Sequence, residues 1–176
     1  MTLPDWHRAD RHPAPPPEPL FDWLCDTGSL TQRLIAAGAD DFRVELLGQC
    51  ISPARDDEAC ALNIEPGAPA WVREVLLHTA GAPRVFARSV AALAALTNSG
   101  LELDDLGTRS LGELLFADAR IQRSDIQISR YPAAWLPEPW QYDGLWARRS
   151  QFSHAELRLL VCEVFLDGWP PADRTV

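Results

Sequence analysis

Apolar residues in this chain form several short runs with the length and spacing of β-strands, and some of these runs alternate apolar with polar positions. Two consecutive runs flank residues 80–83 (Ala-Gly-Ala-Pro), which predicts a hairpin with a short connection. The last two runs are close enough in sequence to form a second hairpin. Strands are predicted over residues 42–51, 70–79, 84–90, 121–130, 145–153 and 157–166.

Helix-start signals separate some of these strands. Ser29 and Ser110 are placed as N-caps, and Glu113 follows Ser110 at the spacing of a capping box. Pro19 suits the first turn of an earlier helix. Helices are predicted over residues 19–25, 30–37 and 111–116, with helical or irregular turns over 91–99 and 101–106.

The remaining segments set the domain organisation. Residues 1–18 are rich in proline and predict a flexible leader, and residues 19–170 are long enough for a single domain with its own core. Residues 54–69 read as a solvated acidic loop, and residues 131–144 as a long loop rich in proline and aromatics. Regular strand–helix alternation is missing. The pattern therefore predicts an α+β fold: a mostly antiparallel sheet with short helices covering one face.

Two charged residues of opposite sign fall where the alternation places an apolar strand face. Arg73 shares its face with positions 71, 75 and 77, and Glu163 shares its face with positions 159, 161 and 165. A buried charge is costly unless it is paired or meets a ligand. Arg73 is therefore either a strand arginine with an ordinary partner or a clamp for a ligand carboxylate, which guanidinium geometry favours. Glu163 is either a structural carboxyl or a group that exchanges a proton with a ligand.

Further arginines could complete such a site. Arg88 lies in the strand predicted to pair with that of Arg73, although the pattern favours a surface position for it, because Arg84 shares its face. Arg148 and Arg149 are adjacent, so they point to opposite faces, and one of them is expected to face inward.

Composition limits the classes of molecule that the protein is expected to bind. The chain has 16 basic and 25 acidic residues and a net charge of −9, which disfavours nucleic acid and anionic membranes. Its four cysteines lack CxxC spacing and its four histidines are scattered, so no metal site is expected. No apolar run has the length of a membrane span, and the N-terminal region lacks a signal-peptide core, so we expect a cytoplasmic protein. An acidic single domain with no exposed apolar run favours a monomer.

Five blocks of sequence together resemble the chorismate pyruvate-lyase family in order and spacing, over about residues 20–166. The resemblance implies a mainly antiparallel sheet covered by helices. It also implies cleavage of chorismate to 4-hydroxybenzoate and pyruvate without a cofactor, as the first committed step of ubiquinone biosynthesis. The blocks are Trp-Val-Arg-Glu-Val-Leu-Leu at 71–77, Ala-Arg-Ser-Val at 87–90, Leu-Gly-Thr-Arg-Ser-Leu-Gly-Glu-Leu-Leu-Phe at 106–116, Trp-Ala-Arg-Arg-Ser at 146–150 and Leu-Leu-Val-Cys-Glu-Val-Phe-Leu at 159–166.

Carried over by position, the resemblance places the aromatic carboxylate on Arg73 and the ring hydroxyl against Glu163. It gives Leu111 a backbone contact to the ligand and makes Leu30 a flap residue. A second arginine, Arg88 or one of the pair at 148 and 149, is expected to hold the enolpyruvyl carboxylate. The sequence departs from the family where alanines at 91–92 stand in place of a common proline, and in the length of the 131–144 loop.

Two other functions fit the same residues. The fold also resembles the effector domains of some transcription regulators, which would make the chain a non-catalytic module that binds a small ligand. In a purely structural domain, Arg73 and Glu163 would simply pair with each other.

Overall fold

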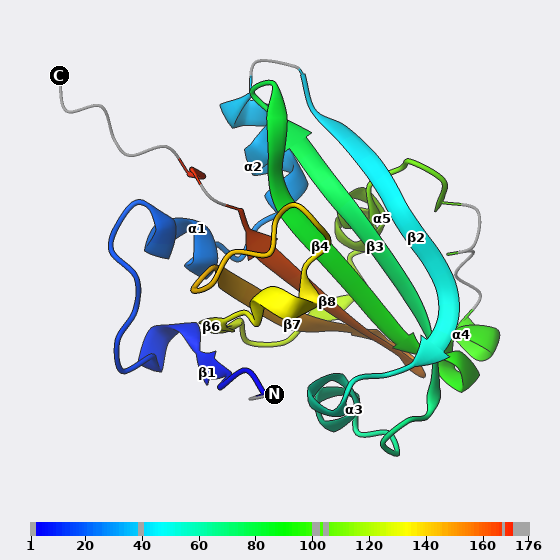
Figure 1. The fold of residues 1–176 in the computed structure, drawn as a ribbon. Coiled ribbons are helices and arrows are strands. Elements are labelled where there is room, and N and C mark those ends of the chain that lie inside the picture. Colours follow the sequence, from blue (N-terminus) through cyan, green and yellow to red (C-terminus); the bar gives the residue numbers. More distant parts are fainter. Residues whose placement is uncertain (1–2, 39–40, 100–102, 104–105, 167, 171–176) are drawn as a thin grey trace, which may run out of the picture.

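A computed structural model describes residues 3–38, 41–99, 103, 106–166 and 168–170. Its main feature is one antiparallel sheet of eight strands, in the order β1-β6-β7-β8-β4-β3-β2, with β5 paired to β7 (Figure 1). The strands are β1 (His7–Arg8), β2 (Arg43–Pro53), β3 (Pro69–Thr79), β4 (Ala82–Ala92), β5 (Gln122–Arg123), β6 (Gln127–Arg130), β7 (Trp146–His154) and β8 (Leu157–Phe165).

Within the described residues, five short α-helices connect the strands. They are α1 (Leu20–Cys25), α2 (Leu30–Ala37), α3 (Asp56–Leu62), α4 (Leu93–Ser99) and α5 (Leu111–Ala117). The predicted α+β class, both predicted hairpins and the two serine-capped helices are confirmed. Among the described residues, no helix combines the length and apolar character that a membrane span requires.

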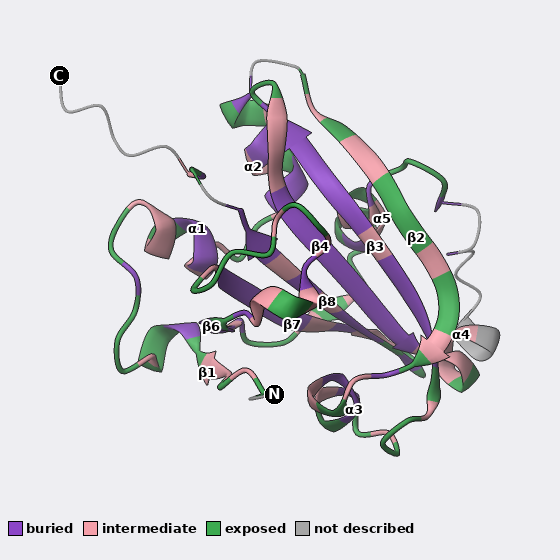
Figure 2. Ribbon diagram, viewed as in Figure 1, coloured by how far each residue is buried: buried purple, intermediate pink, exposed green. Residues whose placement is uncertain are grey.

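Both faces of the sheet are covered. We call the face that carries Arg73 and Glu163 the site face; α1 and α2 pack on one part of it and α5 on another. The opposite face is covered by α3 and by the 131–144 segment, which passes in front of the sheet in Figure 1. Figure 2 shows the result: the central strands are buried, whereas the edge strand β2 is largely exposed.

The acidic 54–69 segment contains α3, where the sequence predicted only a solvated loop. Its acidic residues form the first turn of the helix, and Glu58 accepts a hydrogen bond from the Arg55 backbone N–H at 2.9 Å. The Glu58 carboxylate is buried against Arg88 of β4. Arg88 is distant in sequence from Glu58, so the local pattern alone predicted that the acidic residues face solvent.

Two other segments differ from the expectation. The predicted strand over 121–130 is divided into β5 and β6. Between them, the Ser124 N–H donates to the Gln151 carbonyl at 2.8 Å, and the Ser124 hydroxyl accepts from the Gln151 N–H at 2.9 Å. Part of the expected leader packs on the domain: β1 pairs with β6, and Ala9 is buried there. The tail predicted over 167–176 lies mostly outside the described residues.

Candidate active site

A largely enclosed cavity lies between the site face and the N-terminal ends of α2 and α5. Its volume is about 50 Å³, below the roughly 150 Å³ of a protein cavity that binds benzene. A ring-sized ligand therefore requires the cavity lining to move apart, and the structure describes a closed form. Thr31, Ser110, Arg123, Arg148 and Glu163 form its polar lining, and the other lining residues are apolar or glycine.

A wider hollow of about 600 Å³ lies beside the N-terminal segment, but it is open to the surface. Its lining includes Asp5 and Asp143 together with Arg130, and none of the residues singled out from the sequence. We therefore place the candidate site in the smaller, enclosed cavity.

The two helices that close the cavity meet through their first turns. Ser29 and Ser110 cap α2 and α5 as predicted. The Thr31 and Ser110 hydroxyls are 2.7 Å apart and form a buried hydrogen bond between the helices. Gly112 permits this approach, because a Cβ at this position would lie 2.9 Å from Thr31 Oγ1. Leu30 and Leu111 are the first residues of α2 and α5, and both line the cavity.

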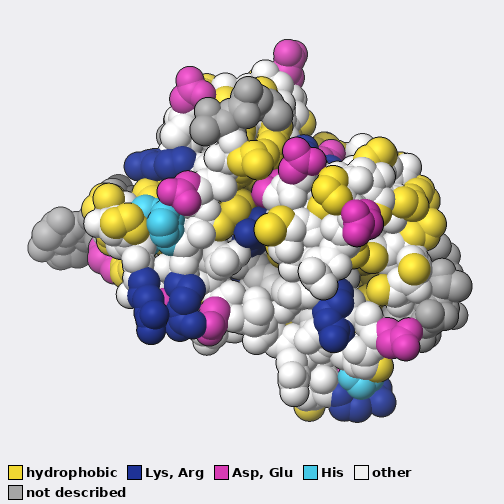
Figure 3. Space-filling model, turned by 90° about the horizontal axis from the view of Figure 1, so that it is seen from below, with side chains coloured by type: hydrophobic (Ala, Val, Ile, Leu, Met, Phe, Trp, Pro, Cys, Tyr) yellow, Lys and Arg dark blue, Asp and Glu magenta, His cyan; other side chains and the backbone are white. Residues whose placement is uncertain are grey.

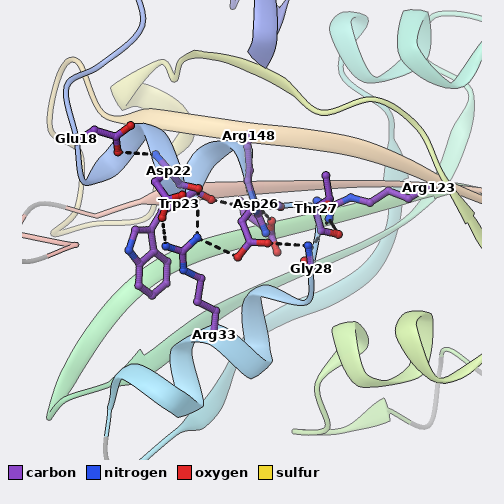
Figure 4. A network of polar contacts seen from close by, with 10 residues as sticks. Glu18, Asp22, Trp23, Asp26, Thr27, Gly28, Arg33, Arg123 and Arg148 are labelled. Atoms are coloured by element: carbon purple, nitrogen blue, oxygen red, sulfur yellow. Dashed lines mark hydrogen bonds and ion pairs between the residues drawn. The ribbon is translucent and has the colours of Figure 1, made fainter.

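Glu163 and Arg148 form an ion pair on the site face. They are cross-strand partners on β8 and β7, and Arg148 Nε donates to Glu163 Oε2 at 2.6 Å. Arg148 Nη1 donates to the carbonyls of Trp23 and Asp26 at 3.0 and 2.8 Å, as Figure 4 shows. Among the described residues, no donor bonds Glu163 Oε1. The ion pair therefore fixes one oxygen of Glu163 and leaves the other without a hydrogen-bond donor among the described residues.

Arg73 lies on the same face of the sheet but does not line the closed cavity. Its guanidinium donates to Gln49 Oε1 at 3.0 Å and to the carbonyls of Gly107 and Arg109 at 2.8 and 3.2 Å. Burial lowers the pKa of Arg73 below its ordinary value. No described carboxylate is ion-paired with Arg73. The purely structural alternative requires Arg73 to pair with Glu163, and the structure does not contain this pair.

Arg88 and Arg149 lie on the opposite face, away from the cavity. Arg88 donates to Glu58 at 2.6 Å and to Glu74 at 2.8 Å. Burial opposes the charge of Arg88, but these carboxylates outweigh it and raise the pKa of Arg88. Arg149 donates to Asp57 Oδ2 at 3.2 Å. The structure does not bring Arg88 to Glu163, because the two residues belong to different faces of the sheet.

Arg123 of β5 lines the cavity and was not singled out from the sequence. Its Nε donates to Ser150 Oγ at 2.7 Å, and Nη1 donates to the Thr27 carbonyl at 2.9 Å (Figure 4). Burial, and secondarily the positive charge of Arg148, lower the pKa of Arg123. The alternation in 121–130 did not predict that Arg123 lines the cavity, because the residues that contact it are distant in sequence.

The charge of the whole molecule gives an anionic ligand little long-range attraction. Figure 3 shows acidic and basic side chains interspersed on the face seen from below, and the whole chain carries a net charge of −9. An anionic ligand must therefore be held by local arginines. Within the described residues, no group of three or more His, Cys, Asp or Glu side chains is arranged to hold a metal ion.

Comparison with protein families and curated proteins gives consistent matches. A family model described as chorismate lyase matches residues 3–171. A protein named probable chorismate pyruvate-lyase from Pseudomonas aeruginosa strain UCBPP-PA14 is 53% identical over 168 residues, which cover 95% of this chain and 94% of that protein. A protein of the same name from Pseudomonas putida is 52% identical over 156 residues, covering 88% and 84%.

Solved structures share the fold at low sequence identity. The effector domain of PhnF from Mycobacterium smegmatis aligns with a TM-score of 0.55 and 16% identity, covering 82% of this chain and 91% of that domain. A GntR-family transcriptional regulator from Bacillus cereus aligns with a TM-score of 0.52 and 12% identity, covering 73% and 94%. At these identities the likeness concerns the fold alone.

Proposed function

The chain belongs to the chorismate lyase family, and we propose that it cleaves chorismate into 4-hydroxybenzoate and pyruvate without a cofactor. The observation that carries the proposal is the enclosed cavity, in which Glu163 is held by Arg148 and has one carboxylate oxygen without a described donor.

The reaction needs no redox partner. The bond between C3 of the ring and the ether oxygen breaks, and enolpyruvate departs. A proton leaves C4, the carbon that bears the hydroxyl, and the ring becomes aromatic. Enolpyruvate takes up one proton at its methylene carbon to give pyruvate, so atoms and charge balance. Because aromatisation drives the reaction, the protein has to bind one reactive conformer and help the proton to move.

Each proposed role follows from a position in the fold. Glu163 accepts a hydrogen bond from the C4 hydroxyl through Oε1 and assists removal of the neighbouring proton. Arg73 holds the ring carboxylate, which would replace the backbone carbonyls of Gly107 and Arg109 as its partner. Leu111 offers a backbone N–H that has no partner within α5, since it is the first residue of that helix. Leu30, the first residue of α2, covers the ligand as a flap.

Closure around the ligand has a kinetic consequence. The cavity has a smaller volume than the substrate, so binding and release both require its lining to move, and we propose that α2 and α5 separate. Exclusion of water strengthens the polar contacts inside, and it also retains the aromatic product. We therefore propose that release of 4-hydroxybenzoate limits turnover.

The wider biological setting is part of the same proposal. A cytoplasmic, monomeric enzyme that feeds 4-hydroxybenzoate into ubiquinone biosynthesis fits the family and the acidic composition of the chain. Its partner would be chorismate, with no nucleic acid and no membrane insertion.

A second function is favoured by one observation, the shared fold with effector domains of transcription regulators. In that case the cavity would bind a small ligand without reaction.

The deciding experiment is incubation of the purified protein with chorismate. 4-Hydroxybenzoate is followed by its absorbance, and pyruvate by reduction with lactate dehydrogenase and NADH. Equimolar formation of both products is expected. Binding of chorismate without either product would support the ligand-binding module instead.

A further inference from the structure

Arg123 occupies the boundary between two cavities. It lines the enclosed cavity together with Arg148 and Glu163, and it also lines a surface cavity of about 400 Å³ next to Cys25 and Asp125. Its guanidinium lies 5.3 Å from the centre of the Phe152 ring and 5.8 Å from that of Phe116. A ligand group held by Arg123 would therefore sit inside the site, at the end nearest solvent.

Among the described residues Arg123 forms no ion pair, although Glu163 and Asp26 act on its charge at longer range. Arg148 is neutralised by Glu163, and on the opposite face Arg88 and Arg149 have carboxylate partners of their own. Among the described residues, Arg123 has no ion-paired carboxylate; its hydrogen bonds go to Ser150 and to two backbone carbonyls. A guanidinium in this position stays charged at neutral pH, so an anionic ligand group is the partner that fits it.

The register of the sheet relates Arg123 to Arg73. Arg73 pairs with Ser89, Ser89 with Val161, and Val161 with Ser150, so these residues form one row across four strands. Ser150 accepts the hydrogen bond from Arg123 Nε. The row is therefore about three strand spacings long, roughly 14 Å between the backbones of Arg73 and Ser150. Arg123 reaches the Ser150 end of this row from β5, which pairs with β7. Val161, in the middle of this row, lines the cavity.

We propose that Arg123 binds the second carboxylate of the substrate, the one on the enolpyruvyl group. The inference rests on the proposed function and fixes the orientation of the substrate within it. The ring carboxylate points toward Arg73, and the leaving group points toward Arg123 and the surface cavity. This assignment uses the only charged cavity residue of the described chain that lacks an ion-pair partner, in place of the arginines that the sequence suggested.

The test compares two ligands that differ in one carboxylate. 3-(Carboxymethoxy)-4-hydroxybenzoate carries an ether-linked carboxylate, but its ring is already aromatic, so it cannot undergo the elimination. 4-Hydroxybenzoate lacks that carboxylate. Calorimetry on Arg123→Gln should show diacid binding weakened roughly 10- to 100-fold, as expected for loss of hydrogen bonds to a charged group. Binding of 4-hydroxybenzoate should stay within about threefold of wild type.

Arg120→Gln is the matched control, because Arg120 is an exposed arginine of the same segment that bonds Asp118. It should bind both ligands as wild type does. Equal weakening of both ligands by Arg123→Gln, or no weakening of either, would overturn the proposal. The retained 4-hydroxybenzoate affinity also reports that the variant is folded. Turnover of chorismate by the wild-type protein is measured separately, so failure of the proposed reaction is distinguishable from failure of this assignment.

Discussion

Arg148 binds the carboxylate of Glu163 through Nε, while its Nη1 donates to backbone carbonyls at the C-terminal end of α1. The side chain of Arg148 is almost fully buried. Its position is thus set by main-chain carbonyls, and the position of Glu163 is set by Arg148. A carboxylate oriented in this way is suited to act on one atom of a ligand rather than to exchange partners.

Replacement of Glu163 by Gln tests its role in proton removal. The amide keeps the size and can still bond the ring hydroxyl, but it cannot accept a proton. We expect kcat to fall about 10²- to 10⁴-fold, while the Kd of 4-hydroxybenzoate changes less than tenfold. Steady-state kinetics and calorimetry measure the two quantities. Glu65→Gln, at an exposed position, is the control; an unchanged kcat in Glu163→Gln would leave Glu163 a structural residue.

Loss of Arg148 should be costly for the fold. Arg148→Met leaves the Glu163 carboxylate without its partner and the carbonyls of Trp23 and Asp26 without their donor. Removal of one partner of a buried pair costs about 3–5 kcal/mol, and urea unfolding should show a loss of this size. The double variant Arg148→Met, Glu163→Leu should recover part of the loss. If the single variant is as stable as wild type, the ion pair does not hold this part of the site together.

Arg73 is predicted to bind the ring carboxylate. Arg73→Ala should abolish both turnover and binding of 4-hydroxybenzoate, because no other cation of the described residues lies at that position on the site face. Arg73→Lys keeps the charge but loses the two-pronged geometry, so it should bind the product weakly. Thermal unfolding of both variants separates loss of the site from loss of the fold. Near-normal kinetics in either variant would remove Arg73 from the site.

The cysteines give an independent check of burial. Cys162 faces the opposite side of the sheet from Glu163, and burial raises the pKa of its thiol, so little thiolate forms at pH 8. Cys50 and Cys60 are exposed. A thiol reagent at pH 8, followed by peptide mass spectrometry, should label Cys50 and Cys60 within minutes and Cys162 only after denaturation. Rapid labelling of Cys162 in the native protein would mean that the sheet is open at β8.

Local patterns in the sequence were enough for the two hairpins and the two serine-capped helices. The choice between Arg148 and Arg149 was not made from the sequence, although a signal for it exists. In a hairpin with a two-residue turn, position 154 faces position 157, and counting back along both strands places Arg148 opposite Glu163.

Other features depend on contacts that no local pattern contains. The helix α3 is stabilised by Arg88 from β4, and Arg123 is held by the segment between α1 and α2. The sequence suggested that Arg88 could join Arg73 in the site, because their strands were predicted to pair. The register puts Ser89, and not Arg88, opposite Arg73, so Arg88 points to the other face.

The hydrogen bond between Thr31 and Ser110 should control how fast the site opens. Thr31→Val removes the bond with little change in shape, at a cost of about 0.5–1.5 kcal/mol to the closed form. The dissociation rate of 4-hydroxybenzoate should rise about 2- to 10-fold, and kcat should rise with it if product release limits turnover. Stopped-flow fluorescence, with the tryptophans as reporters, measures the rate. Thr108→Val, at an exposed position near α5, should leave it unchanged. A faster release with an unchanged kcat would show that a step other than opening limits the reaction, whereas an unchanged release rate would show that the two helices do not form the gate.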